Sequence, residues 1–147
     1  MRVKRLKIFA FGGNDLAAMD LNSPVSGKPI AADIATQWRR TAKTSEIMAD
    51  IISKFPDDCY IITHGNGPQV GNILLRSEYS RPILPPIPLD VCVANTQSAM
   101  GYMLSQLTNA LLMREIHKTV VTVVTQVVVT PDDPAFQNPA KFIGPDY

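Results

Sequence analysis

Two short glycine-rich segments carry the residue types that could bind an anion. Residues 65–67 read Gly-Asn-Gly and precede Pro68, and residues 12–14 read Gly-Gly-Asn. A glycine loop that leads into a helix lets backbone N–H groups approach a ligand, and the helix dipole favours a negative charge there by about 0.3 to 1 kcal/mol. Both segments therefore predict a site for a small anion. Residues 65–67 taken alone fit a simple tight turn equally well.

The other chemically active residues are few. His64 adjoins the second loop, where it could donate to a ligand or orient the loop through a backbone hydrogen bond. His64 and His117 are too isolated in the sequence to predict a metal site. Cys59 and Cys92 have no paired spacing, so two reduced thiols are expected. The glycines after residue 64 are spaced one residue too far apart for a dinucleotide-binding fingerprint.

Two strands are expected to position the glycine segments. Residues 6–11 (LKIFAF) and 60–63 (YIIT) are apolar runs that end just before these segments, so we expect buried strands. Between them, from about Ala32 to Phe55, apolar residues recur at three- and four-residue intervals, which predicts an amphipathic helix. A strand–helix–strand unit pairs in parallel, so both glycine segments would meet at the carboxyl edge of the sheet.

Two further helices follow in the prediction. One begins after Pro68 and runs towards Tyr79, and a third begins with Asp90 as its cap and continues to Ile116. Prolines between residues 82 and 88 enforce an extended connection between these helices. Gly101 would allow the third helix to approach a neighbour closely.

The last predicted element is a strand over residues 119–130, whose unbroken β-branched content suits burial on both faces. Residues 20–29 contain many turn formers and predict a loop. The fold class is therefore α/β, with an open, mainly parallel sheet and helices on both faces. No later segment of the sequence would cover the strand at 119–130, so the fold reads as truncated.

Composition excludes several classes of protein. The chain has 147 residues and is 46% hydrophobic, which is enough for the core of one domain. Its net charge of +1 gives no reason to expect a nucleic acid or membrane partner. The apolar stretch after the first basic residues is too short for a signal peptide or a membrane span. We therefore expect a soluble, cytoplasmic protein.

Taken together, the motifs closely resemble the N-terminal half of the carbamate kinases, which belong to the amino-acid-kinase fold. The similarity covers nearly the whole chain and keeps the family's order and approximate spacing. Ala10 argues against the related acetylglutamate kinases, which carry a lysine there. The matching stretches are FGGN at 11–14, RRTAK at 39–43, ITHGNGPQVGN at 62–72, PLDVCVA at 88–94, QSAMGYM at 97–103, TVVTQVVV at 122–129 and DPAFQNPAKFIGP at 133–145.

The resemblance implies a role for each matching segment. Residues 1–130 would form the acceptor-binding half of the kinase domain, residues 131–147 would begin a protruding subdomain, and the C-terminal nucleotide-binding half would be absent. Lys141 matches a catalytic lysine that reaches over the transferring group. The residues that match the two phosphate-contacting loops are Gly12, Gly13, Asn14, Gly65, Asn66 and Gly67.

The implied activity is reversible phosphoryl transfer in arginine metabolism, ATP + carbamate ⇌ ADP + carbamoyl phosphate. ATP or ADP with Mg²⁺ would be bound mainly by the missing half, and the family leads us to expect a homodimer. The 147-residue chain by itself is expected to be inactive. Asp15 stands where the family usually has a small apolar residue, which places a negative charge beside the first loop. Two alternatives stay open: a non-catalytic truncated remnant or binding subunit, and a same-fold kinase of another small acid.

Overall fold

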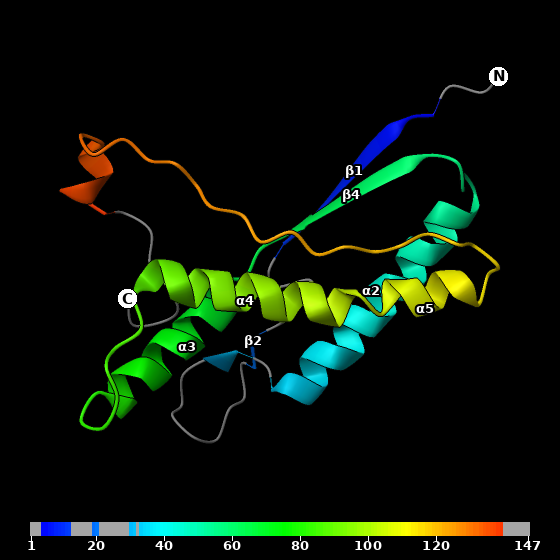
Figure 1. Ribbon diagram of the computed structural model, residues 1–147. Coiled ribbons are helices and arrows are strands. Elements are labelled where there is room, and N and C mark those ends of the chain that lie inside the picture. Colours follow the sequence, from blue (N-terminus) through cyan, green and yellow to red (C-terminus); the bar gives the residue numbers. More distant parts are fainter. Residues whose placement is uncertain (1–3, 13–18, 21–29, 32, 140–147) are drawn as a thin grey trace.

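The structure is a computed structural model that describes residues 4–12, 19–20, 30–31 and 33–139 (Figure 1). Two short parallel strands lie against a layer of helices, and the described part after the last α-helix is an extended segment with a 3₁₀ turn. In chain order the elements are β1 (Leu6–Phe11), β2 (Met19–Asp20), β3 (Ile30–Ala31), α2 (Ile34–Ser53), β4 (Cys59–His64), α3 (Gly67–Ser80), α4 (Leu89–Leu104), α5 (Leu107–Leu112) and η1 (Pro134–Phe136).

Strands β1 and β4 pair in parallel, as the sequence predicted. Their register joins Leu6 to Cys59 at one end and Phe11 to His64 at the other, with α2 as the connection between them. The α/β class and the parallel pairing are therefore confirmed. Every second side chain of both strands is exposed, however, so neither is buried on both faces. Among the described residues the helices cover one face, and Leu6 and Ile8 on the other face are 60% and 63% exposed.

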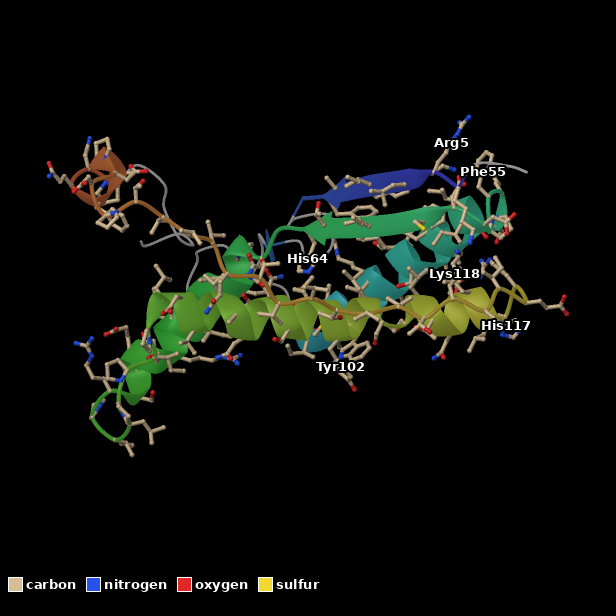
Figure 2. The ribbon with its side chains drawn as sticks, turned by 45° about the horizontal axis from the view of Figure 1, so that its top comes forward. Arg5, Phe55, His64, Tyr102, His117 and Lys118 are labelled. Atoms are coloured by element: carbon tan, nitrogen blue, oxygen red, sulfur yellow. The ribbon has the colours of Figure 1, made fainter. Side chains whose placement is uncertain are left out.

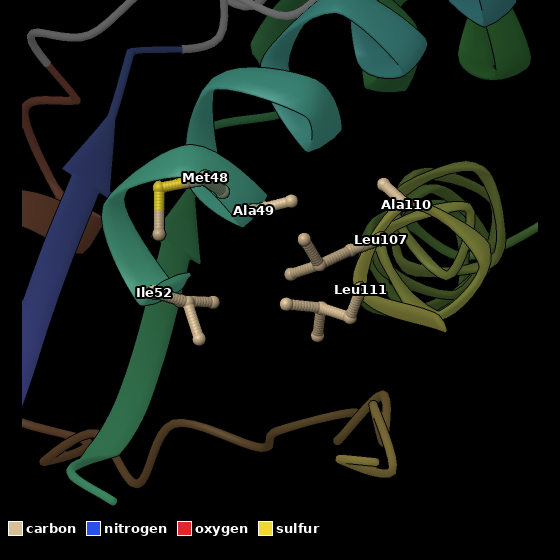
Figure 3. Close-up of a cluster of buried hydrophobic side chains, with 6 residues drawn as sticks. All are labelled: Met48, Ala49, Ile52, Leu107, Ala110 and Leu111. Atoms are coloured by element: carbon tan, nitrogen blue, oxygen red, sulfur yellow. The ribbon is translucent and has the colours of Figure 1, made fainter. Parts of the chain in front are cut away.

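The core lies between the sheet, α2 and α5 (Figure 3). Helix α2 begins where Asp33 accepts a hydrogen bond from the N–H of Thr36 at 2.8 Å, close to the predicted start. Phe9, Phe11, Tyr60 and Ile62 pack from the strands against this core. Its buried centre consists of Met48, Ala49, Ile52, Leu107, Ala110 and Leu111.

The predicted third helix is divided into α4 and α5. At the break, the Ser105 hydroxyl donates to the carbonyl of Tyr102 at 2.6 Å, and Gln106 Nε2 donates to the carbonyl of Met103 at 2.8 Å. These side chains compete for backbone carbonyls at the helix end, which explains why the helix stops there. Asp90 is not the cap as predicted; Pro88 is the N-cap residue, and Asp90 lies in the first turn, where the dipole still favours its charge.

The predicted strand at 119–130 is wrong, because residues 116–130 form neither strand nor helix. A pocket separates the first part of this segment from β4, so no backbone ladder joins them. The segment is held to α4 instead: Gln97 accepts from the Thr125 N–H at 2.8 Å and donates to the Thr125 carbonyl at 3.3 Å. Strand propensity requires a neighbour to pair with, and without one Val128 is 97% exposed.

Two smaller features complete the fold. Met19–Asp20 and Ile30–Ala31 pair antiparallel, at the ends of the predicted loop whose residues 21–29 lie outside the described part. The proline-rich connection is fixed by Ser77 of α3, whose hydroxyl accepts the N–H of Ile87 at 2.7 Å. None of the helices in the described part of the chain is both long and apolar enough to span a membrane.

Candidate functional site

The two glycine segments begin side by side at the carboxyl edge of the sheet. Phe11 and His64 are the last paired residues of β1 and β4, and the N–H of Gly65 donates to the carbonyl of Phe11 at 3.1 Å. Gly12 follows Phe11 directly, so Gly12 and Gly65 continue two neighbouring strands. Gly13 and Asn14 lie outside the described residues. The predicted meeting of the two loops is therefore confirmed for the residues at which each begins.

Helix α3 begins inside the second glycine segment. Asn66 is its N-cap residue, Gly67 is its first residue and Pro68 follows. Asn66 makes no side-chain cap bond among the described residues, so the cap does not occupy the N–H groups of the first turn. Together with the helix dipole, these groups form a positive end that points at the junction of β1 and β4.

Gly67 stands at an open position where neither packing nor a left-handed backbone requires glycine. Its φ does not lie in the left-handed region, and a Cβ added there would meet no described atom within 4 Å. The absence of a side chain therefore leaves the start of α3 open to a small molecule. Packing within the described part of the chain does not demand glycine at this position.

Helix α4 fixes the side chain of Asn66. Asn66 Nδ2 lies 2.6 Å from Thr96 Oγ1 and 3.4 Å from the carbonyl oxygen of Val93. The Thr96 hydroxyl donates in turn to the carbonyl of Val93 at 2.8 Å. The loop and the helix are thus joined by side-chain contacts between residues 30 positions apart.

Gln69, in the first turn of α3, is a buried polar residue. Its side chain is 8% exposed, and neither its oxygen nor its nitrogen finds a partner among the described residues. Buried polar atoms are nearly always hydrogen-bonded, and leaving one unpaired costs about 1 to 3 kcal/mol. Gln69 is therefore a second polar group near this loop that has capacity to bind.

A pocket of about 740 Å³ runs along β4 between this strand, α4 with α5, and the extended segment. His64, Asn66 and Gln97 line it at the glycine end. His64 Nδ1 lies 3.4 Å from the carbonyl oxygen of Gly65, a long contact that fits the orienting interpretation of this histidine better than a free donor. The remaining lining is mostly apolar, from β4, α4 and α5.

The opposite end of the sheet carries a structural charge cluster (Figure 2). Buried Asp58 pairs with Lys7 at 2.9 Å and accepts the Arg5 N–H at 3.1 Å, while Lys118 donates to its carbonyl at 3.0 Å. Lys7 also lies 3.5 Å above the ring of Phe55. The side chains of Lys7 and Lys118 and the backbone N–H of Arg5 thus join the amino ends of both strands around Asp58, away from the glycine segments.

Comparison with known proteins finds similarity to carbamate kinases in sequence and in structure. No family model matches the chain. It is 49% identical over 114 residues to the carbamate kinase of Thermococcus kodakarensis, covering 76% of this chain and 36% of that protein. It is 42% identical over 140 residues to the carbamate kinase of Lentilactobacillus hilgardii, covering 94% of this chain and 40% of that protein. The chain is related to the carbamate kinases.

The structural match agrees with the sequence match. The solved carbamate kinase of Giardia superposes with a TM-score of 0.82 at 30% identity, over 97% of this chain and 45% of that protein. The chain therefore spans less than half the length of the relatives that it matches. Its relationship to carbamate kinases supports a kinase-like function.

The structure adds two residues to the candidate site that sequence reasoning missed. Thr96 directly precedes the QSAMGYM motif, and Gln69 lies inside HGNGPQVGN, but no local pattern assigned their side chains a role. Lys141 lies outside the described residues, so its role stays a prediction. Cys59 and Cys92 are both free thiols, as predicted. Burial, with a smaller contribution from Asp90, raises the pKa of the Cys92 thiol and so disfavours its reactive thiolate.

Proposed function

We propose that this chain binds the carbamate and carbamoyl phosphate side of the reaction ATP + carbamate ⇌ ADP + carbamoyl phosphate. The observation that carries the proposal is the junction of β1 and β4, where the Gly65 N–H bonds to Phe11 and α3 begins two residues later. A small anion at this junction would meet backbone N–H groups and the positive end of a helix. Similarity to carbamate kinases supplies the identity of the anion.

The residue types suit phosphoryl transfer. A carbamate oxygen forms a bond to the γ-phosphorus of ATP while the bond from that phosphorus to the leaving ADP oxygen breaks, and the reverse step makes ATP. Such transfer depends mainly on holding the reactants in line and on balancing charge on the equatorial oxygens. The first turn of α3 would hold the carbamoyl end. Carbamate is already anionic, so no general base is needed.

We also propose that Lys141 balances charge on the transferring phosphoryl group, and that the nucleotide is bound by a part of the kinase domain that this chain does not contain. Mg²⁺ bound with the nucleotide would supply positive charge that balances the charge of its phosphates. No group of three or more His, Cys, Asp or Glu side chains in the described ranges is arranged to hold a metal ion. We therefore assign no step of the reaction to a metal held by these residues.

The direct test is ligand binding by the 147-residue chain. Calorimetric titration with carbamoyl phosphate should give saturable binding at one site, whereas sodium chloride at equal ionic strength should not. Backbone amide resonances of Gly65, Asn66, Gly67 and Gln69 should shift on titration. If carbamoyl phosphate shifts only resonances away from β1, β4 and the start of α3, the proposed function is wrong.

The second test is turnover by the protein translated from the complete gene. It should form ATP from ADP and carbamoyl phosphate, and Lys141→Ala should lose most of that rate. Lys54→Ala is a matched control, because this exposed lysine lies at the end of α2, away from the glycine segments. Equal rates in the two variants would remove Lys141 from the mechanism.

A second candidate function is a non-catalytic binding subunit. The observation that favours it is the apolar surface of the extended segment, where Val123 and Val127 are 73% and 81% exposed. Such a subunit would bind a protein partner without forming ATP, so the turnover measurement separates the two functions. In either case we propose a homodimer, which sedimentation of the complete protein would test.

A further inference from the structure

The hydrogen bonds of Thr96 determine which way the Asn66 carboxamide points. Thr96 is 1% exposed, and its single hydroxyl proton is donated to the Val93 carbonyl at 2.8 Å. Its oxygen can therefore only accept from Asn66, 2.6 Å away, which requires the amide nitrogen of Asn66 to face it. The Val93 carbonyl, 3.4 Å from the same nitrogen, can also only accept. Two independent acceptors thus assign the nitrogen and oxygen of this amide.

This assignment leaves the Asn66 side chain with both donors used and, among the residues that the structure describes, with Oδ1 as an unused acceptor. Both N–H bonds of its side chain are directed at α4, and the remaining polar atom is Oδ1. A phosphate oxygen at neutral pH is an acceptor too, so Oδ1 cannot hydrogen-bond to it. The side chain of Asn66 is therefore unsuited to the phosphate contact that the resemblance implied, and that contact falls to backbone N–H groups of the loop and of α3.

We propose that Asn66 Oδ1 accepts a hydrogen bond from the amino group of the carbamoyl moiety, with Thr96 as its positioning residue. This inference rests on the proposed function. Carbamate and carbamoyl phosphate carry their only N–H donors on that amino group, while their oxygens accept. The loop would then distinguish the two ends of one substrate: Oδ1 takes the amino group, and the start of α3 takes the charged oxygens.

The proposal predicts a specificity that phosphate binding alone would not give. Acetyl phosphate has a methyl group in place of the amino group and is otherwise nearly isosteric. Bound in the same pose it would leave Oδ1 of Asn66 facing a methyl group, without the hydrogen bond that the amino group supplies. A site built around a substrate N–H discriminates strongly against an analogue that lacks it. Carbamoyl phosphate should therefore bind at least about tenfold more tightly than acetyl phosphate.

The experiment compares three ligands and two variants in the 147-residue chain. Carbamoyl phosphate, acetyl phosphate and inorganic phosphate are titrated into the unmodified chain, Thr96→Val and Thr96→Ser. Valine keeps the shape of the side chain but removes the acceptor, so the carboxamide is no longer fixed and the preference for carbamoyl phosphate should fall to about threefold or less. Serine keeps the hydroxyl, so Thr96→Ser should retain the preference for carbamoyl phosphate over acetyl phosphate.

The ratio of the two affinities separates positioning from damage to the fold. General destabilisation would weaken acetyl phosphate and carbamoyl phosphate together and leave their ratio unchanged, which would overturn the proposal. Equal affinities in the unmodified chain would overturn it too, while leaving the proposed function standing. If none of the three ligands binds, both the function and the inference are wrong.

A measurement without ligand checks the same orientation. The side-chain NH₂ resonances of Asn66 should show slow hydrogen exchange in the unmodified chain and in Thr96→Ser, and fast exchange in Thr96→Val. Fast exchange in the unmodified chain would show that the amide nitrogen is not held by Thr96, which contradicts the assignment directly.

Discussion

The substitution Gly67→Ala should change stability and ligand binding in opposite directions. The structure shows no described atom within 4 Å of an added Cβ and a φ that alanine accepts. Replacing glycine at such a position restricts the unfolded chain and stabilises the fold by about 0.4 to 1 kcal/mol. For a chain of this size, that corresponds to a melting temperature higher by about 1 to 4 °C.

Binding should weaken because of where the new methyl group lies. Side chains on a helix tilt towards its N-terminus, so the Cβ of the first residue of α3 would project over the loop and its N–H groups. Losing one hydrogen bond to a charged ligand costs about 1.5 to 3 kcal/mol, which lowers the affinity for carbamoyl phosphate about tenfold to a hundredfold. Thermal unfolding and calorimetric titration measure the two effects on one preparation.

Gly101→Ala is the matched control. It is the same substitution in a helix, but its Cβ would collide with the side chain of Thr122. This variant should melt at a lower temperature and detach the extended segment from α4, so that the Thr125 amide exchanges faster. An affinity of Gly67→Ala for carbamoyl phosphate within twofold of the unmodified chain would refute the placement of the ligand at the start of α3.

Three further predictions concern the fold. Leu111→Ala should lower the free energy of unfolding by about 2 to 5 kcal/mol, measured by urea denaturation, because Leu111 is 1% exposed in the core; a loss below 1 kcal/mol would contradict this placement. The hydrogen bond from the Thr36 N–H lowers the pKa of Asp33 in the folded chain below its ordinary value of 3.8. The cap therefore stabilises the fold at pH values above 3.8. This stabilisation is lost as the pH falls through the lower pKa of the folded state. Asp33→Ala should therefore have a lower melting temperature than the unmodified chain at pH 7 and the same melting temperature in strong acid. Asp33→Asn should keep most of the stability of the unmodified chain at both pH values. The chain should also self-associate through its exposed valines. Val127 and Val128 are 81% and 97% exposed, and replacing both by lysine should shift the sedimentation coefficient towards that of the monomer. A monodisperse monomer of the unmodified chain at all concentrations would contradict self-association through this surface.

Local sequence patterns were sufficient to predict the strands that carry the glycine segments and the helix between them. The apolar runs at 6–11 and 60–63, with a helical pattern between them, determine a parallel pair by handedness and connection length alone. The meeting of Gly12 and Gly65 follows from that pairing. Nothing in this inference needed a side chain from elsewhere in the chain, which explains why it could be made from the sequence.

The rest depended on contacts between distant residues. The hydroxyl of Thr96 contacts Asn66, which lies 30 residues earlier in the sequence, and no periodic pattern in the sequence predicts such a contact. The stretch at 119–130 was misassigned because β-branched content reports a preference that only a pairing partner can satisfy. The division between α4 and α5 depends on Ser105 and Gln106, whose side chains bind carbonyls of the preceding turn.

Helix α4 connects the proposed ligand loop with the extended segment. Thr96 holds Asn66, and the next residue, Gln97, holds both backbone groups of Thr125. Consecutive side chains on a helix point in directions about 100° apart, so Thr96 and Gln97 contact different segments. Helix α4 therefore orients both the loop with Asn66 and the extended segment with Thr125, which border the same pocket. A displacement of α4 would therefore alter the orientation of the Asn66 carboxamide and the position of Thr125 in the extended segment together. Gln97→Ala isolates the two effects, since it should release Thr125 and leave the preference for carbamoyl phosphate intact.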